Sequence, residues 1–278
     1  MTDESTRSAA QDELRSARTA LFVPGDRPDR FEKAAASGTD LVVCDLEDAV
    51  TPERRSEALG TVADWLAGEA RACVRTNASG TTELEAELTR LRGLPGLLAV
   101  IVPKAEEPAE LERIHRHLDV PVVALIESAV GVARVTELAA APGVVRLGFG
   151  HLDYSVDIGS GNGRAAMLTA RSAVVLASRL ADLAGPFDGV TPELDDVDRV
   201  ADDAIYALHL GFAGKLLIHP RQVSPARRTF TPGADEVDWA QRVVAASEQG
   251  GAVRVDGSMV DAPVVARALR VLSQNRGV

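Results

Sequence analysis

The sequence predicts an α/β fold, a closed (β/α)8 TIM barrel with a C-terminal helical lid extension. Short apolar runs alternate with segments of helical periodicity eight times between residues 19 and 230. The runs are apolar throughout, which is typical of parallel strands covered on both faces. Chemically reactive side chains follow the runs, as they do at the C-terminal face of a barrel that carries an active site. A doubly wound open sheet is the alternative, but it does not need eight units, and no glycine fingerprint follows the first strand.

The predicted elements follow one another with recognisable start and stop signals. Gly38 is a C-terminal stop for the first helix after a strand. Thr51-Pro52-Glu53 combines an N-cap hydroxyl, a proline and a first-turn acid, so a helix is expected to begin there. Strands are predicted at 19–24, 40–45, 72–76, 98–102, 121–126, 144–148, 187–190 and 215–218, with helices between them that include 29–37 and 165–183.

The chain divides into three predicted parts. Residues 1–18 are polar with mixed charges, and we expect a flexible tail or a short surface helix there. Residues 19–234 form the barrel. Residues 235–278 carry two further helical stripes, separated by a glycine-containing segment at 250–263 that predicts a short hairpin. An appendage after a complete barrel is either packing or a lid.

Composition excludes several classes of function. The formal net charge of −11 argues against nucleic acid as the main partner, because phosphate recognition needs a basic face. No apolar stretch approaches the roughly 20 residues that span a bilayer, and the first residues lack the apolar core of a signal peptide. Cys44 and Cys73 lie inside predicted strands and are interpreted as small core residues of a cytoplasmic protein.

Glu127 and Asp153 are the strongest candidate pair. Each follows a predicted strand, and the two strands are consecutive, so the carboxylates are expected to face one another at the barrel mouth. Two carboxylates with open positions suit Mg²⁺, which prefers oxygen ligands and keeps several waters. The alternative is that each acid is solvated or caps the helix that follows it.

Arg75 ends the third predicted strand inside the mouth. Its rigid fork of donors suits a carboxylate or a developing oxyanion, and an internal ion pair with Glu47 or Asp48 is equally compatible. The turn Asp45-Leu46-Glu47-Asp48 puts three acids within four residues. Such a cluster is costly unless a hydrated metal ion or Arg75 compensates the charge, so Glu47 and Asp48 are assigned to the surroundings of the catalytic site.

The turn after the first strand is basic. Arg27, Arg30 and Lys33 stand near a helix N-terminus, which favours anions, and are candidate ligands for phosphates. Lys104 could form a Schiff base, as in metal-free aldolases, but a charged residue at the barrel mouth is the preferred interpretation. His151 and His219 stand near the mouth without the spacing of metal ligands.

Six ordered motifs resemble the citrate lyase β-subunit-like family, which includes malyl-CoA and citramalyl-CoA lyases. The resemblance runs from about residue 19 to 263. It implies a Mg²⁺-dependent barrel that works as a homotrimer or hexamer on a C–C bond beside a CoA thioester. The motifs are Phe-Val-Pro-Gly-Asp-Arg at 22–27, Asp-Leu-Glu-Asp at 45–48, Val-Arg-Thr-Asn at 74–77, Pro-Lys-Ala-Glu at 103–106, Ile-Glu-Ser at 126–128 and Ile-His-Pro at 218–220.

The resemblance also assigns roles by position. Glu127 and Asp153 match the family's metal ligands, and Arg75 matches its substrate-binding arginine. Asp261, in Met-Val-Asp-Ala-Pro at 259–263, matches the aspartate of a C-terminal lid that acts on the acetyl-CoA methyl group in the neighbouring subunit. Many members have Glu-Asp at the second ligand, whereas this chain has Gly-His-Leu-Asp at 150–153, so the acyl substrate is not inherited.

The function predicted from these residues is cleavage or formation of a carboxylated 3-hydroxyacyl-CoA, such as malyl-, citramalyl- or citryl-CoA, with acetyl-CoA and a 2-oxoacid on the other side. Mg²⁺ is the expected cofactor, and CoA is part of the substrate. Three alternatives remain open: a thioesterase acting on the same substrates, a 2-oxoacid aldolase that needs no CoA, and an accessory subunit of a larger lyase complex.

Overall fold

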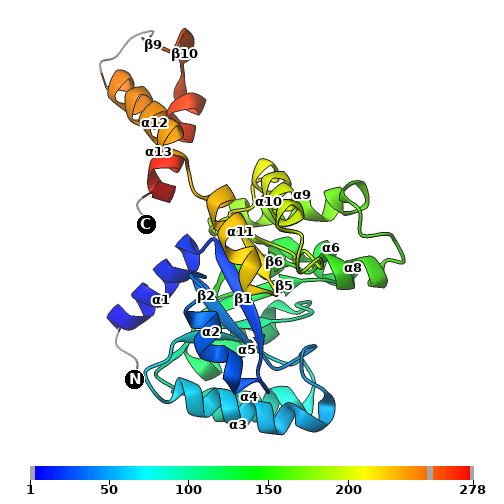
Figure 1. Cartoon of the computed structure of the whole chain (residues 1–278). Helices are drawn as coiled ribbons and strands as arrows, with labels where there is room; N and C mark the ends of the chain where they lie inside the picture. Colours follow the sequence, from blue (N-terminus) through cyan, green and yellow to red (C-terminus); the bar gives the residue numbers. More distant parts are fainter. Residues whose placement is uncertain (1–3, 249–252, 276–278) are drawn as a thin grey trace. The chain divides into compact units, whose positions relative to one another are not determined.

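Eight parallel strands close into a barrel in the computed structural model, which describes residues 4–248 and 253–275 (Figure 1). Each strand pairs with the next along the chain, and β8 closes the ring by pairing with β1. This confirms the predicted fold. The strands are β1 Thr19–Pro24, β2 Leu41–Asp45, β3 Ala72–Arg75, β4 Leu97–Val102, β5 Val122–Ile126, β6 Val144–Phe149, β7 Phe187–Asp188 and β8 Gly214–Leu217.

Helices surround this barrel and connect its strands. The predicted strand positions agree with the structure to within two residues, whereas the first predicted helix is shorter and begins as a 3-10 turn at Pro28–Arg30. The helices of the barrel are α2 Phe31–Ala35, α3 Arg55–Leu66, α4 Thr82–Leu91, α5 Pro108–Leu118, α6 Ala129–Ala133, α7 Val135–Ala139, α8 His151–Asp157, α9 Arg164–Leu180, α10 Val197–Leu210 and α11 Val223–Phe230, with 3-10 turns also at Pro52–Arg54 and Pro220–Gln222.

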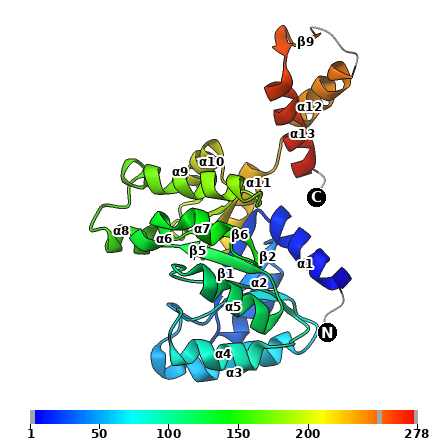
Figure 2. The ribbon, with the colours of Figure 1, turned by 180° about the vertical axis from the view of Figure 1, so that it is seen from behind.

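Residues 4–16, before the first strand, form a helix, which is the second of the two predicted alternatives for this segment. Helix α1, Glu4–Ser16, contacts β6. Both ribbon views show it beside the barrel (Figure 1, Figure 2). Its Leu14 is fully buried and joins the apolar cluster inside the barrel. The guanidinium of Arg146, also buried, donates to the carbonyls of Leu14 and Ala17 at the C-terminal end of α1. The packing of this helix against the barrel is hard to predict from the sequence, because a single leucine anchors an otherwise polar segment.

Leu14→Ala should therefore destabilise the protein. Truncating a fully buried leucine removes apolar contact and leaves a cavity, which costs about 2–5 kcal/mol in the free energy of unfolding. Urea unfolding followed by far-UV circular dichroism measures this difference. Leu194→Ala, at a leucine that is 45% exposed, is the matched control and should change stability little. Equal effects of the two substitutions would contradict an anchoring role for Leu14.

The barrel interior is apolar at its centre. A cluster of buried side chains from β1 to β8 fills it, including Val43, Ile101 and Leu125. Cys44 and Cys73 are both buried free thiols, which confirms their predicted role in the core. Burial raises the pKa of the Cys73 thiol to about 12, so the thiol stays protonated and unreactive.

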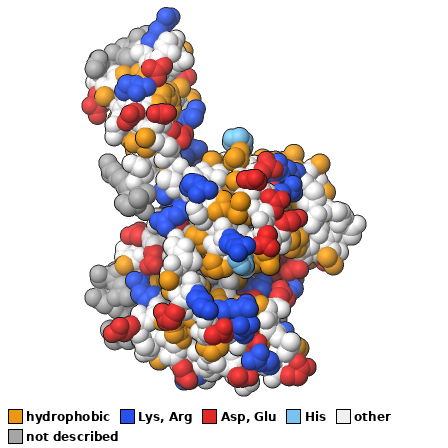
Figure 3. All heavy atoms as spheres, viewed as in Figure 1, with side chains coloured by type: hydrophobic (Ala, Val, Ile, Leu, Met, Phe, Trp, Pro, Cys, Tyr) orange, Lys and Arg blue, Asp and Glu red, His pale blue; other side chains and the backbone are white. Residues whose placement is uncertain are grey.

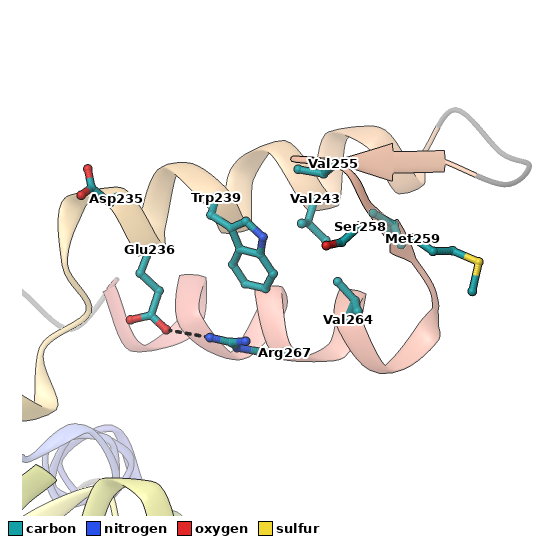
Figure 4. A pocket seen from close by; sticks show the side chains of 10 residues that line it. Asp235, Glu236, Trp239, Val243, Val255, Ser258, Met259, Val264 and Arg267 are labelled. Carbon is teal, nitrogen blue, oxygen red and sulfur yellow. Dashed lines mark ion pairs between the residues drawn. The ribbon is translucent and has the colours of Figure 1, made fainter.

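The C-terminal part of the chain is a second compact unit. It comprises residues 228–278, whereas the sequence placed the boundary between 234 and 235. Helices α12, Ala234–Ser247, and α13, Ala262–Asn275, lie side by side, and Arg267 lies near the ring of Trp239 between them (Figure 4). The predicted hairpin is present as β9 Val253–Val255 and β10 Ser258–Val260. The first part of its predicted segment, 250–252, lies outside the described residues.

In the described parts of the chain, none of the helices has both the length and the apolar character needed to cross a bilayer.

Candidate active site

A cavity of about 410 Å³ opens at the C-terminal ends of the barrel strands. It brings together five of the predicted site residues, Arg30, Asp48, Arg75, Glu127 and Asp153. Apolar side chains form the rest of its wall. The lining residues are Phe22, Pro24, Arg30, Asp45, Asp48, Ala49, Arg75, Leu125, Glu127, Gly150, His151, Leu152, Asp153, Gly189, Val190, Leu216 and Ile218.

Arg75 binds Asp45 through two parallel hydrogen bonds. Nε donates to Oδ1 and Nη2 to Oδ2, each at 2.7 Å. The predicted partners also lie close, since Nη1 is 3.1 Å from Glu47 Oε2 and 3.3 Å from Asp48 Oδ2. Asp45 was not among the partners predicted for Arg75. The signal was present, because Asp45 and Arg75 end neighbouring strands and are direct register partners.

Arg75 keeps its positive charge in this environment. Burial alone would lower its pKa, but the hydrogen bonds and charges of Asp45, Glu47 and Asp48 raise the pKa above its usual value. The guanidinium also lies 4.9 Å from the centre of the Phe22 ring, within cation–π distance. The guanidinium is therefore held by the Phe22 ring and by the hydrogen bonds to the Asp45 carboxylate.

Lys104 forms an ion pair with Glu47. Nζ lies 2.6 Å from Oε1 of this buried carboxylate. Burial opposes the charge of the lysine, but the hydrogen bond to Glu47 and the nearby acids raise the pKa of Lys104. A Schiff-base lysine needs a neutral amine, so this pairing favours the interpretation of Lys104 as a charged residue of the barrel mouth. Together Arg75 and Lys104 compensate the acidic turn.

Glu127 is buried at the end of β5 and stays close to Asp153. Its Oε1 accepts a hydrogen bond of 2.8 Å from the backbone N–H of Lys104, a residue with the positive φ of 47°. Burial and the charges of Glu47 and Asp153 raise the pKa of Glu127 to about 8. Asp153 lies in the first turn of α8, not directly at the strand end, and reaches the same cavity.

These carboxylates fit a divalent cation. Burial together with mutual repulsion makes a bound cation the natural partner for Glu127 and Asp153, and both offer oxygen ligands of the kind that Mg²⁺ prefers. Among residues 4–248 and 253–275, no cluster of three or more His, Cys, Asp or Glu is arranged to hold a metal ion. Two protein ligands would leave the remaining positions to water and substrate, which is usual for Mg²⁺.

Gly150 makes room for the Glu127 carboxylate. A Cβ at position 150 would lie 2.4 Å from Oε2 and 2.7 Å from Cβ of Glu127. Only glycine allows so close an approach, which gives a physical reason for the glycine in the Gly-His-Leu-Asp segment.

Gly150→Ala should therefore displace Glu127 and weaken magnesium binding about 10–100-fold, the range measured when groups that orient metal ligands are altered. Isothermal titration calorimetry measures the affinity. Gly161→Ala is the control, because a Cβ at position 161 meets no atom within 4 Å and its backbone has no positive φ. Equal affinities in the two variants would show that the spacing at position 150 does not position the carboxylate.

His151 forms part of the cavity wall as a neutral imidazole. Burial and the nearby charge of Arg171 lower its pKa to about 4. The ring packs against Gly189, where a Cβ would lie 2.3 Å from Nδ1. Nδ1 is buried and has no hydrogen-bond partner within the described part of the chain. The sequence placed His151 near the mouth but gave it no role.

Glu87 supports the acidic turn at 45–48 indirectly, through Asn77. This buried glutamate on α4 accepts hydrogen bonds from the backbone and side-chain amides of Asn77. The side-chain amide of Asn77 also donates to the Leu46 carbonyl at 2.9 Å. Burial raises the pKa of Glu87 to about 7. Nothing in the spacing of the sequence distinguishes Glu87 from the exposed glutamates of its helix.

The other predicted site residues have separate positions. Arg30 lines the cavity, but Arg27 pairs with Asp29 at 2.9 Å on the surface, and neither Arg27 nor Lys33 is a lining residue. Asp261 belongs to the second compact unit, where its Oδ1 accepts from the backbone of Val264 at 3.1 Å and caps α13. The structure thus groups Arg30 with the catalytic candidates and leaves the role of Asp261 untested.

Known proteins resemble this chain in sequence and in structure. A family model described as HpcH/HpaI aldolase/citrate lyase matches residues 18–220. A citrate lyase subunit beta-like protein of Deinococcus radiodurans is 37% identical over 278 residues, covering 92% of this chain and 96% of the relative. The (3S)-malyl-CoA thioesterase of Cereibacter sphaeroides is 29% identical, covering 94% of this chain and 95% of that protein.

A solved structure agrees with the observed fold. CitE from Mycobacterium tuberculosis, in complex with magnesium, acetoacetate and coenzyme A, superposes with a TM-score of 0.83 at 33% identity, covering 95% of this chain and 100% of the other. The family match spans the whole barrel, and the structural match extends beyond it. The chain belongs to the HpcH/HpaI aldolase/citrate lyase family of carbon–carbon lyases.

Proposed function

We propose that this protein is a Mg²⁺-dependent lyase that cleaves or forms a carboxylated 3-hydroxyacyl-CoA. The products of cleavage are acetyl-CoA and a 2-oxoacid. The observation that carries the proposal is the cavity at the barrel mouth, where buried Glu127, Asp153 and the carboxylate-bound Arg75 meet. Relatives support it, since the M. tuberculosis structure holds magnesium and coenzyme A.

Glu127 and Asp153 would hold the cation. When bound, Mg²⁺ supplies Lewis-acid polarisation of the substrate's hydroxyl and carboxylate oxygens. Arg75 contributes a fixed positive charge beside the oxygen that becomes the carbonyl of the 2-oxoacid. Asp45, Glu47 and Asp48 keep that arginine in place through their ion pairs.

The reaction balances without a further reactant. In cleavage, the hydroxyl gives its proton to solvent water at the open mouth of the cavity, the carbinol C–O becomes C=O, and the electrons of the adjacent C–C bond pass to the thioester as an enolate. The enolate carbon then takes up a proton to give the methyl group of acetyl-CoA. We assign that proton to Asp261 of a neighbouring copy, in line with the family resemblance. We assign contact with the CoA phosphates to Arg30, which lines the cavity.

The assignment of Asp261 requires a homo-oligomer, which we propose to be a homotrimer or a hexamer. Exposed apolar side chains support it: on α9, Leu168, Leu176 and Leu180 are 43–65% exposed, and on α10 Ile205 is 45% exposed. Apolar side chains also show among charged ones on the barrel unit in Figure 3. Exposed apolar side chains on two contacting helices are candidates for a subunit interface. Light scattering coupled to size exclusion measures the oligomeric state.

A thioester panel tests the function. Purified protein is incubated with malyl-, citramalyl- and citryl-CoA, with magnesium or with a chelator, and 2-oxoacid and free CoA are measured separately. The proposal expects magnesium-dependent formation of one 2-oxoacid per acetyl-CoA. Failure to produce a 2-oxoacid from any thioester in the presence of magnesium would overturn it and favour an accessory subunit.

Thioester hydrolysis is a second candidate, favoured by the likeness to the (3S)-malyl-CoA thioesterase. The same panel separates the two, because hydrolysis releases free CoA and an intact hydroxyacid with no new 2-oxoacid. A 2-oxoacid aldolase that needs no CoA would be insensitive to changes at Arg30, whereas the proposed lyase should bind its thioester less tightly after Arg30→Ala.

Magnesium binding should depend on pH through Glu127. Its pKa of about 8 means that much of the metal-free protein carries a proton there at neutral pH, and the cation must displace that proton. The apparent affinity should therefore rise from pH 6 to about pH 8 and then level off. Calorimetry in two buffers of different ionisation enthalpy measures the proton released. An affinity that is flat over this range, with no proton release, would contradict the raised pKa.

A further inference from the structure

We propose that the hydroxyl-bearing carbon of the substrate carries an uncharged apolar substituent. The 2-oxoacid is then monocarboxylic with a short alkyl chain, as in pyruvate or 2-oxobutyrate, and not a dicarboxylic acid such as oxaloacetate. This inference rests on the proposed function and names the substrate class of the same site.

The floor of the cavity is apolar and continuous with the barrel core. Phe22, Leu125, Val190 and Leu216 line the cavity, and all four also pack in the cluster that fills the barrel interior. They come from the first, fifth, seventh and eighth strand regions, so they meet from opposite sides of the barrel. The floor is therefore the top layer of the core.

This floor is closely packed. Leu125 Cδ1 and Leu216 Cδ1 lie 3.1 Å and 3.9 Å from the position that a Cβ would take on Gly148 of β6. Both leucines are nearly inaccessible, at 2% and 3% exposure. Side chains held this way keep their positions, so the floor presents a fixed apolar surface to the bound acid.

The positive charges around the cavity already have carboxylate partners. Arg75 is bound by Asp45 in two hydrogen bonds. Lys104 lies 2.6 Å from Glu47, and Lys215, at the start of β8, lies 3.3 Å from Asp188.

The remaining cation of the described lining is Arg30, which is exposed at the end of its 3-10 turn. One cation does lie beside the floor, since the Arg75 guanidinium is 4.9 Å from the centre of the Phe22 ring, but Asp45, Glu47 and Asp48 already compensate its charge.

A carboxylate on the substituent would face this apolar floor. Such a group loses its hydration without gaining a counter-charge, which is strongly unfavourable. A methyl or ethyl group at the same place is buried against Leu125, Val190 and Leu216 and gains apolar contact. The substrate's other carboxylate and its hydroxyl belong to the acidic half of the cavity, where the cation is proposed to bind.

Condensation with a series of acids tests the proposal. Acetyl-CoA and magnesium are incubated with glyoxylate, pyruvate, 2-oxobutyrate or freshly dissolved oxaloacetate, and kcat/KM is measured for each. We expect kcat/KM for pyruvate or 2-oxobutyrate to exceed that for oxaloacetate at least about 100-fold, and to exceed that for glyoxylate about 10-fold or more, because glyoxylate leaves the floor unfilled. Equal or faster turnover of oxaloacetate would overturn the inference and leave the lyase function standing.

A matched pair of variants at the partly exposed Val190 tests the charge directly. Val190→Lys adds a cation at the floor and should raise the oxaloacetate-to-pyruvate ratio at least about 10-fold, whereas Val190→Met changes size without charge and should not. Arg30→Ala should lower kcat/KM for all four acids by a similar factor and leave their ratio unchanged. A collapse of selectivity in Arg30→Ala, with no change in Val190→Lys, would place the discrimination at the mouth and overturn the proposal.

Binding separates failure of this inference from failure of the proposed function. If no acid is condensed, the lyase function fails, and the acids are then compared by calorimetry with the magnesium-loaded protein. Tighter binding of 2-oxobutyrate than of oxaloacetate would still support an apolar floor that selects the substituent. Tighter binding of oxaloacetate would overturn it.

Discussion

Glu127→Gln should lower kcat/KM of the lyase reaction by about 10²–10³-fold or more, the loss expected when a principal electrostatic group of a site is removed. Glutamine keeps the shape of the side chain and can still accept from the backbone N–H of Lys104, as Oε1 does now. It lacks the negative charge that a cation needs. Calorimetry should therefore show magnesium affinity falling together with activity, even where the physiological substrate is not yet in hand.

The same substitution should not weaken the metal-free fold. Burial and the charges of Glu47 and Asp153 raise the pKa of Glu127, so its contribution to stability is fully present below about pH 4.5 and is lost as pH rises through about 8. The variant escapes that loss, so its stability relative to the wild type should increase between pH 5 and pH 9 in the presence of a chelator. Urea unfolding across that pH range measures the difference.

Glu112→Gln, at a half-exposed carboxylate of α5, is the control for Glu127→Gln. Glu112 lies 3.7 Å from Arg116 in a surface ion pair, and such pairs contribute little. Activity, magnesium affinity and the pH profile of stability should all match the wild type. Full activity in Glu127→Gln would show that the reaction does not need Glu127 as a metal ligand, whatever result the Glu112→Gln control gives.

The barrel was predictable because its strands have a physical signature. Parallel strands covered on both faces are apolar throughout, and reactive residues follow them, so eight strands and the position of Arg75, Glu127 and Asp153 could be inferred without coordinates. The burial of the N-terminal helix was not predictable on that basis. Its burial depends on Leu14 and on the distant Arg146, which are 132 positions apart.

The fine structure of the site was less predictable for a related reason. The acids of the turn at 45–48 were visible, but which of them binds Arg75 depends on strand register, and the register pairs Arg75 with Asp45. The support from Glu87 and the positive φ of Lys104 arise from tertiary packing. Composition and spacing therefore identify the types of residue in this site, while register and burial decide their partners.

Arg75→Met should produce the largest loss of stability at the site. It leaves Asp45 and Glu47, which are 2% and 4% exposed, without the guanidinium that compensates them. Removing one member of a buried ion pair costs about 3–5 kcal/mol in the free energy of unfolding, because the other charge remains buried. Urea unfolding at neutral pH measures it. Arg90→Met, in a surface pair 2.7 Å from Asp64, should cost only about 0–1 kcal/mol.

A second substitution distinguishes the ion pair from simple loss of packing. Asp45→Asn in the Arg75→Met background removes the stranded charge, so the double variant should recover part of the stability lost in Arg75→Met. If packing against Phe22 were the main contribution of Arg75, Asp45→Asn would recover nothing.

Arg75→Lys separates charge from geometry. It keeps a positive charge but cannot reproduce the two parallel hydrogen bonds to Asp45. It should therefore retain more stability than Arg75→Met and yet lose about 10²-fold in kcat/KM, because the charge no longer stands at a fixed place beside the reacting oxygen. Wild-type activity in Arg75→Lys would show that the paired geometry of the guanidinium serves the fold and not the reaction.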